Sequence, residues 1–157
     1  MKILHTEIEI EAPAGRVWQI LTDIARFPEW NPFVRRIQGE LREGNRLEVL
    51  LQPPDSRGMN FRPTVLKVEP ERELRWLGHL WAPGLFDGEH SFTIESLAEG
   101  CVLFVQREEF TGLLVPLLMR SLEVDTRRGF EAMNRAIKEQ AEGSAGDLGV
   151  ITVMGET

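Results

Sequence analysis

The residues from 113 to 143 carry the pattern that most constrains how this chain can fold. Apolar side chains recur there at three- and four-residue spacing, with charged side chains on the opposite face, which predicts one long amphipathic helix. The apolar positions are Val115, Met119, Leu122, Phe130, Met133 and Ile137. Gly143 follows the pattern and is typical of a helix end. A helix of about 27 residues is roughly 40 Å long, so it needs a long apolar surface to cover it.

The chain before this helix changes to a period of two, which predicts strands. The predicted strands are residues 2–11, 33–41, 45–52, 61–69, 72–81, 88–97 and 101–110. Gly44, Gly100 and Pro70-Glu71 occupy short connections between consecutive strands, so we expect hairpins and an antiparallel meander. The segments 52–60 and 82–88 are rich in Gly and Pro and are predicted to be turns.

Two short helical pieces are expected after the first strand. Pro13 suits the first turn of a helix, and Pro28 and Pro32 bracket a second short piece. The fold class is therefore α+β, with a seven-stranded curved antiparallel sheet wrapped around the long C-terminal helix. We expect one domain over residues 1–143 and a disordered tail over residues 144–157, which contains an apolar patch at 150–154.

Composition excludes several classes of function. A formal charge of −7 over 157 residues argues against a nucleic-acid binder, and no apolar run reaches the roughly 20 residues of a membrane span. The single Cys101 cannot form an internal disulfide, so we expect a reducing, cytoplasmic location. His5, His79 and His90 have no metal-ligand spacing, and no glycine-rich phosphate loop is present. We therefore expect no metal and no cofactor. We also expect the protein to be a monomer or a weak homodimer.

Four segments have the order and spacing of a known group of proteins: 12–32 (APAGRVWQILTDIARFPEWNP), 41–49 (LREGNRLEV), 68–76 (VEPERELRW) and 88–112 (GEHSFTIESLAEGCVLFVQREEFTG). The sequence resembles the START/Bet v1-like (SRPBCC) superfamily, and within it the stand-alone bacterial polyketide cyclase/dehydrase and lipid-transport-like group. This resemblance implies the helix-grip fold and an apolar cavity between the sheet and the long helix. It does not select a function, because the superfamily includes carriers, cyclases, hormone receptors and chaperone cofactors.

Strand alternation predicts which side chains face that cavity. In each strand the apolar parity is taken as the inner one, and the long helix supplies the opposite wall. The predicted ligand-binding residues are Leu47, Val49, Trp76, His90, Phe92, Phe104, Gln106, Glu108, Met119, Phe130 and Met133. We expect a mostly apolar cavity of a few hundred Å³, with a polar spot near His90 and Glu108.

His90 and Glu108 allow two interpretations. They can orient the polar group of a ligand, and a buried carboxyl can also serve as a general acid or base. Alternatively, they can bond each other or the backbone as part of the core. Neither lies near a nucleophile or a second acid at a diagnostic spacing, so no catalytic residue is assigned and both stay candidates.

Three functions remain open. Binding or carriage of a small hydrophobic ligand, such as a lipid, polyketide or aromatic metabolite, needs only the cavity and is favoured. A polyketide cyclase or dehydratase activity needs Glu108 and His90 as an acid/base pair. A protein-binding role like that of chaperone cofactors would use an exposed face and the patch at 150–154.

Overall fold

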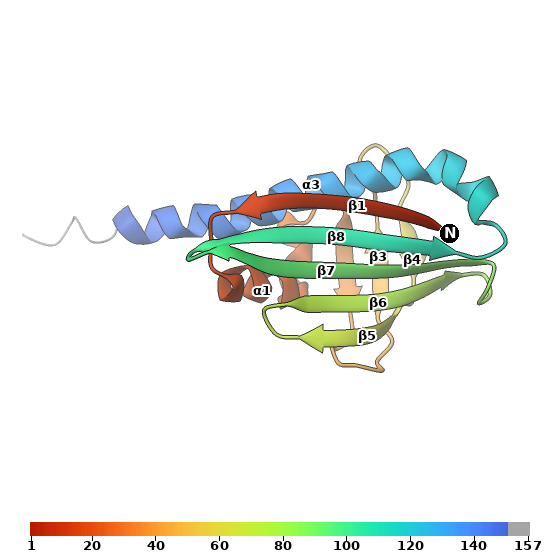
Figure 1. The fold of residues 1–157 in the computed structure, drawn as a ribbon, viewed down its shortest axis with the longest axis horizontal. Helices are drawn as coiled ribbons and strands as arrows, with labels where there is room; N and C mark the ends of the chain where they lie inside the picture. Colours follow the sequence, from red (N-terminus) through yellow and green to blue (C-terminus); the bar gives the residue numbers. More distant parts are fainter. Residues whose placement is uncertain (151–157) are drawn as a thin grey trace, which may run out of the picture.

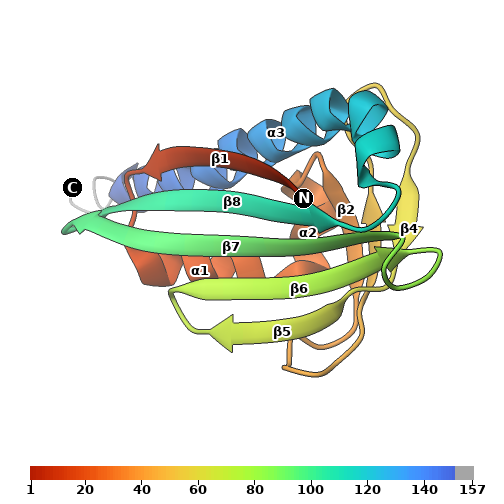
Figure 2. The ribbon, with the colours of Figure 1, turned by 45° about the vertical axis from the view of Figure 1, so that its right-hand side comes forward.

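The computed structural model describes the backbone of residues 1–150 and the side chains of residues 1–143. It is an α+β fold in which a five-stranded antiparallel sheet, a three-stranded antiparallel sheet and a long C-terminal helix enclose one core (Figures 1 and 2). The elements in chain order are β1 (Lys2–Ile10), α1 (Ala14–Thr22), η1 (Ile24–Arg26), α2 (Phe27–Trp30), β2 (Val34–Gln38), β3 (Glu48–Leu51), β4 (Met59–Phe61), β5 (Thr64–Glu69), β6 (Glu73–Leu80), β7 (Phe86–Ala98), β8 (Cys101–Thr111) and α3 (Val115–Val150).

The strands form two sheets instead of the predicted single seven-stranded sheet. The larger sheet has the order β1-β8-β7-β6-β5, and the smaller has the order β2-β3-β4. The predicted strand over 61–69 is divided at Pro63, because proline has no backbone N–H to donate to a ladder. The part before Pro63 pairs with β3, and the part after it pairs with β6.

Backbone hydrogen bonds still connect the two sheets at this corner. The amide of Leu47 donates to the carbonyl of Pro63 at 2.8 Å, and the amide of Val65 donates to the carbonyl of Asn45 at 2.8 Å. The chain thus turns from one sheet into the other without leaving these groups unpaired, which gives the strong curvature that the sequence predicts.

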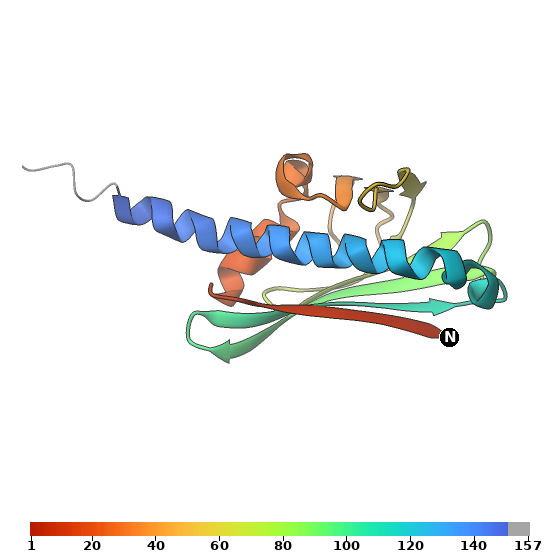
Figure 3. The ribbon, with the colours of Figure 1, turned by 90° about the horizontal axis from the view of Figure 1, so that it is seen from above.

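Helix α3 lies between the two sheets. Figure 3 shows the five-stranded sheet on one side of α3, and α2 with β2–β4 on the other. Met119, Phe130 and Met133 are buried as predicted, and Leu122 is half-buried. Burying such large side chains removes apolar surface from water, which is the main force that holds the helix in place.

The ends of α3 differ from the prediction. The helix begins at Val115, and it continues past Gly143 to Val150. Gly143 therefore does not end the helix. Residues 151–157 lie outside the described residues, as do the side chains of 144–150. The predicted disordered tail and the apolar patch at 150–154 fall largely on this part of the chain and stay predictions.

The short helices follow their sequence signals. In α1, Val17 and Leu21 are buried one turn apart, and the helix begins directly after Pro13. After α2, the side-chain oxygen of Asn31 accepts hydrogen bonds from the amides of Phe33 at 3.0 Å and Val34 at 2.9 Å. This Asn-centred turn fixes the chain just before β2 and directs Phe33 into the core. No helix in the described part of the chain combines the length and apolar character that a bilayer crossing needs.

Candidate cavity and its polar wall

Two glycines on neighbouring strands leave a gap in the inner surface of the sheet. Gly78 of β6 and Gly88 of β7 are direct partners in the antiparallel ladder. A β-carbon on Gly78 would lie 3.0 Å from the ring of Phe61, and one on Gly88 would lie 2.5 Å from Oε1 of Glu108. Glycine is unfavourable in a strand interior, and it often marks a position where another group must come close to the backbone.

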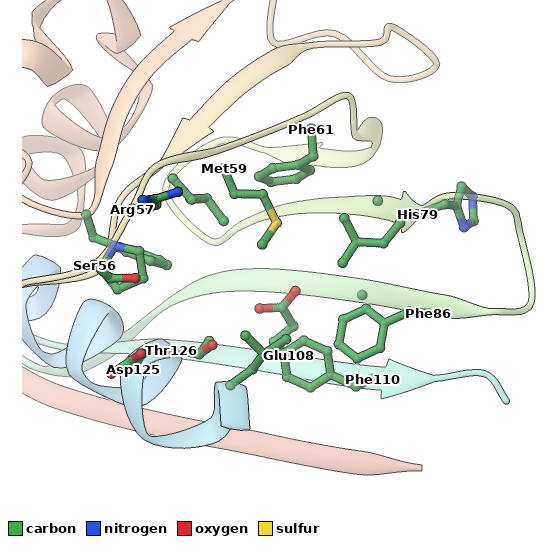
Figure 4. Close-up of a pocket in the computed structure, with 17 residues that line it drawn as sticks. Ser56, Arg57, Met59, Phe61, His79, Phe86, Glu108, Phe110, Asp125 and Thr126 are labelled. Atoms are coloured by element: carbon green, nitrogen blue, oxygen red, sulfur yellow. The ribbon is translucent and has the colours of Figure 1, made fainter. Parts of the chain in front are cut away.

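A cavity of about 130 Å³ lies over these glycines. Its wall comes from β3, β4, β6, β7, β8, α3, the connection between β3 and β4, and Phe33 just before β2 (Figure 4). The lining residues are Phe33, Leu51, Pro53, Ser56, Arg57, Met59, Phe61, Gly78, His79, Leu80, Phe86, Gly88, Glu108, Phe110, Leu122, Asp125 and Thr126. Four phenylalanine rings are among them, so the wall is mainly apolar and aromatic, as in most small-molecule sites.

The polar groups of the wall are unevenly distributed. Figure 4 shows Ser56, Arg57, Asp125 and Thr126 toward one end of the cavity and His79 toward the other. The carboxyl group of Glu108 projects between these ends, next to the ring of Phe110. Glu108 therefore places a carboxyl group beside the apolar part of the cavity.

Glu108 is held by a hydrogen bond to the core. Its Oε2 lies 3.3 Å from Nδ1 of His90, and the exposed fractions of the two side chains are 16% and 6%. The other carboxyl oxygen, Oε1, lies over Gly88 on the cavity side. The glutamate thus joins a buried polar cluster to the cavity.

The polar cluster continues from His90 through the core. Nε2 of His90 lies 3.1 Å from Oε1 of Gln106. Nε2 of Gln106 donates to Oδ1 of Asn134 at 2.7 Å and to the carbonyl of Phe130 at 3.2 Å, and Nδ2 of Asn134 donates to Oγ1 of Thr6 at 3.0 Å. Such a network is stable in a core only when its members are satisfied, and each of these side chains has a partner.

The structure places the predicted site residues in three settings: the cavity wall with its hydrogen-bond partner, the buried polar cluster, and the packed core. Glu108 lines the cavity, and His90 is its hydrogen-bond partner. Gln106 belongs to the buried cluster behind them. The remaining predicted residues are part of the packed core, with exposed fractions of 5% or less, and do not line the cavity: Leu47, Val49, Trp76, Phe92, Phe104, Met119, Phe130 and Met133.

The reason for this difference is aromatic packing. The ring of Phe92 makes an edge contact with Trp76 at 5.1 Å between centroids and stacks with Phe104 at 6.3 Å. Phe130 contacts both His90 and Phe33. These rings fill the middle of the space that the strand pattern predicts to be open. The cavity lies further along the same strands, where glycine replaces large side chains, and it is smaller than the few hundred Å³ expected.

The predicted site did not include the two glycines or the connection between β3 and β4. Glycines ten residues apart on the two arms of a hairpin are a signal that was available, because the turn brings them opposite each other. Ser56 and Arg57 carry no such signal. They lie in a segment predicted to be a turn, and only the folded structure brings that segment to the cavity wall.

A second hollow of about 400 Å³ lies on the outer side of β3 and β4. Its lining includes Arg36, Glu48, Asn60 and Arg62, all exposed, so it is a more polar groove than the cavity over the glycines. Within the described residues no three His, Cys, Asp or Glu side chains come together as a metal site.

Comparison with known proteins agrees with this architecture. Many solved structures share the fold, and three serve as examples. The di-domain aromatase/cyclase StfQ of the steffimycin pathway has a TM-score of 0.72 at 17% identity, covering 92% of this chain and 51% of that one. A norcoclaurine synthase from Thalictrum flavum has a TM-score of 0.71 at 15% identity (92% and 96%). A START superfamily protein from Mycobacterium smegmatis has a TM-score of 0.70 at 16% identity (90% and 97%).

These identities show the fold alone, and the chain spans about half the length of StfQ. No curated protein matches the sequence. The family model described as "Polyketide cyclase / dehydrase and lipid transport" matches residues 1–142, which is all of the chain except its C-terminal end. The chain therefore belongs to the polyketide cyclase/dehydrase and lipid transport family.

Proposed function

We propose that the protein binds a small hydrophobic molecule in the cavity over Gly78 and Gly88. The observation that carries this proposal is an aromatic cavity with one ordered carboxyl group in its wall. Apolar surface supplies the affinity for such a ligand, and a few placed polar groups orient it. The volume of about 130 Å³ is close to that of an apolar cavity of roughly 150 Å³ that binds benzene in another protein.

Two features favour a binding cavity over a packing defect. Phe86 and Phe110 have their ring centroids 5.5 Å apart, so the apolar wall is formed by ordered contacts. Glu108 is partly exposed on the cavity side while its other oxygen is bonded to His90. A carboxyl group that faced only packed apolar atoms would be costly to bury, whereas a cavity that takes up a polar ligand group lowers this cost.

Native mass spectrometry of the protein purified from its source, followed by extraction of any bound small molecule, tests this proposal. Binding of an uncharged naphthylamine fluorescent probe provides a second measurement. Leu122→Trp places a larger ring at the cavity wall and should abolish probe binding. Val124→Trp is the matched control, because Val124 lies on the exposed face of the same helix and should leave binding unchanged. Equal binding by both variants would contradict the proposed site.

A second candidate function is catalysis of a cyclase or dehydratase type. The hydrogen bond between Glu108 and His90 favours it, because such reactions need a group that moves a proton at a carbon next to a carbonyl. This activity predicts that the protein exchanges the α-protons of a small aryl ketone with D₂O, and that Glu108→Gln abolishes the exchange. If the wild-type protein and the variant exchange at the same rate as buffer, this result contradicts the catalytic proposal.

Three further proposals concern the location, the cofactor requirement and the oligomeric state of the protein. We expect the protein to act in the cytoplasm, without a cofactor, as a monomer or weak homodimer. Size-exclusion chromatography with light scattering over a range of concentrations measures the last of these.

A further inference from the structure

The hydrogen bonds that Gln106 makes in the buried cluster behind Glu108 have a fixed donor-to-acceptor direction. The carbonyl oxygen of Phe130 can only accept a hydrogen bond, and it lies 3.2 Å from one terminal atom of the Gln106 side chain. That atom must therefore be the amide nitrogen Nε2. The carboxamide oxygen of Gln106 then faces His90, because the two terminal atoms of an amide point in opposite directions.

This orientation of Gln106 determines where His90 carries a proton. Nε2 of His90 lies 3.1 Å from the Gln106 oxygen, which is an acceptor. A hydrogen bond at this distance requires a proton on Nε2. Asn134 supports the same arrangement from the other side, since its oxygen accepts from Gln106 and its nitrogen donates to Thr6.

Nδ1 of His90 then shares one further proton with Glu108. Oε2 of Glu108 lies 3.3 Å from Nδ1. If His90 is an imidazolium, Nδ1 donates to a carboxylate; if His90 is neutral, Nδ1 accepts from a protonated carboxyl. A neutral ring beside an ionised Glu108 would place a lone pair against a carboxylate oxygen and leave no proton for the bond.

In both arrangements the oxygen on the cavity side is an acceptor. When Glu108 is ionised, Oε1 is a carboxylate oxygen. When Glu108 is protonated, the proton lies on Oε2 and Oε1 is a carbonyl oxygen. Oε1 lies over Gly88, which lines the cavity. The core cluster therefore presents an acceptor to the ligand whichever of the two groups holds the proton.

The other charged and titratable groups of the wall come from different elements. Asp125 of α3 is half-buried and adds a second carboxyl group. Arg57, in the connection between β3 and β4, is exposed, and His79 of β6 is exposed and bonded to Asp87 at 2.7 Å. The carboxylate of Asp125 disfavours an anion, as does Glu108 when it is ionised, whereas the single arginine is surrounded by solvent, where its attraction is weak.

We infer that the cavity selects small ring compounds that carry a hydrogen-bond donor, a hydroxyl or an amine, and discriminates against carboxylates such as fatty acids. Glu108 is the specificity-determining residue, and Gln106 is a positioning residue that acts through His90. This inference rests on the proposed function, since it names the ligand class of the same cavity. It narrows the range of lipids, polyketides and aromatic metabolites that the apolar wall alone would admit.

The test is a titration of the isotope-labelled protein with four matched probes, followed by NMR. The probes are 4-methylphenol, toluene, 4-methylanisole and 4-methylbenzoate. We expect 4-methylphenol to bind roughly fivefold more tightly than toluene or 4-methylanisole, since it alone donates a hydrogen bond to Oε1. We expect 4-methylbenzoate to bind most weakly. Toluene and 4-methylanisole have no donor and act as controls for ring size and for an acceptor oxygen.

Variants at two neighbouring glutamates separate specificity from stability. Glu108→Leu should remove the preference for 4-methylphenol while toluene still binds. Glu109→Leu is the matched control, because Glu109 lies on the opposite face of β8, pairs with Arg107 and does not line the cavity. It should keep the preference. Gln106→Leu should weaken the preference about as much as Glu108→Leu if Gln106 acts through His90.

The imidazole ¹⁵N shifts of His90 in the unmodified protein provide a measurement that needs no variant. A proton on Nε2 is expected, and a neutral ring with its proton on Nδ1 would overturn the positioning role of Gln106. Equal or tighter binding of 4-methylanisole or 4-methylbenzoate would overturn the inference itself, while leaving the proposed binding function intact. Failure of all four probes to bind would overturn both.

Discussion

The ring of Phe33 lies directly against Gly129 of α3, so that a β-carbon at Gly129 would overlap with the ring carbons. Phe33 is held there by the turn at Asn31 and by an edge contact with Phe130, 5.7 Å between centroids. A glycine in the middle of a helix is unfavourable by roughly 1 kcal/mol relative to alanine. This contact explains why the helix has one at this position.

Gly129→Ala should therefore destabilise the protein. The gain in helix propensity is outweighed by the displacement of Phe33, because overpacking a core costs about 1–3 kcal/mol. We expect a net loss of about 1 kcal/mol, and at most about 2 kcal/mol, in the free energy of unfolding, measured by urea denaturation. Since Phe33 also lines the cavity, ligand binding should change as well.

The smaller side chain of Phe33→Leu provides the control. In this background Gly129→Ala should cost less, because the ring it displaces is absent. A Gly129→Ala variant that is as stable as the wild-type protein would show that Phe33 moves aside freely, contrary to this account.

Gly88→Ala tests the position of Glu108. A β-carbon at Gly88 would lie 2.5 Å from Oε1 of Glu108, so the carboxyl group must move away from the cavity wall. We expect the His90 ring resonances to shift and the preference for 4-methylphenol to fall. Gly15→Ala is a comparable change, since its β-carbon would lie 2.8 Å from Oε1 of the exposed Glu71. That glutamate can move into solvent, so this variant should leave both properties unchanged.

The hydrogen bond between Gln106 and Asn134 should contribute measurably to stability. Both side chains are buried, and Gln106→Leu leaves Oδ1 of Asn134 without its donor. A buried polar group without a partner costs about 1–3 kcal/mol. A double-mutant cycle with Asn134→Leu, measured by urea denaturation, should give a coupling energy of at least about 0.5 kcal/mol. Additive effects within experimental error would argue against a connected network.

The lowered pKa of Glu73 makes the stability of the protein depend on pH. Burial raises the pKa of Glu73, but hydrogen bonds from Lys67 and Arg75 outweigh burial and hold this pKa below its usual value of 4.5. The unfolded chain therefore binds more protons near this pH than the folded protein does. The stabilisation is fully present above about pH 4.5 and is lost as the pH falls through the pKa of the folded state.

We expect Glu73→Gln to lose less stability than the wild-type protein when the pH falls from 6 to 3, as measured by thermal unfolding. Lys67 and Arg75 stabilise the charged form of Glu73. The glutamine variant has no charge at this position, so protonation between pH 6 and 3 removes no stabilisation there. Parallel pH profiles for the two proteins would contradict the assignment.

Strand alternation predicted the inner faces correctly but placed the cavity too near the middle of the sheet. On β8 the inner face contains Phe104, Gln106 and Phe110, as expected, and all three are buried. The cavity lies beside Phe110, while Phe104 is packed in the core. Alternation states which face a side chain occupies, but it says nothing about how well that face is filled along its length.

The two-sheet arrangement had a local signal in Pro63, because proline rarely continues a central strand. Strand alternation indicated His90, Gln106 and Glu108 as inner polar residues, but their connection to Asn134 and Thr6 had no local signal. Thr6 and Asn134 are 128 positions apart, and their hydrogen bond exists only because α3 packs against β1. The chemistry of the cavity wall depends on such distant contacts, whereas the fold class depends on patterns that are local in the sequence.

The most direct test of ligand binding in this cavity is a set of intermolecular nuclear Overhauser effects between bound 4-methylphenol and the protein. If the ligand binds in this cavity, we expect contacts from its ring to the protons of Phe86, Gly88 and Phe110, which line the cavity. Contacts only with Arg36, Asn60 or Arg62, in the outer groove, or a bound ligand without any contact to the cavity residues, would contradict binding there.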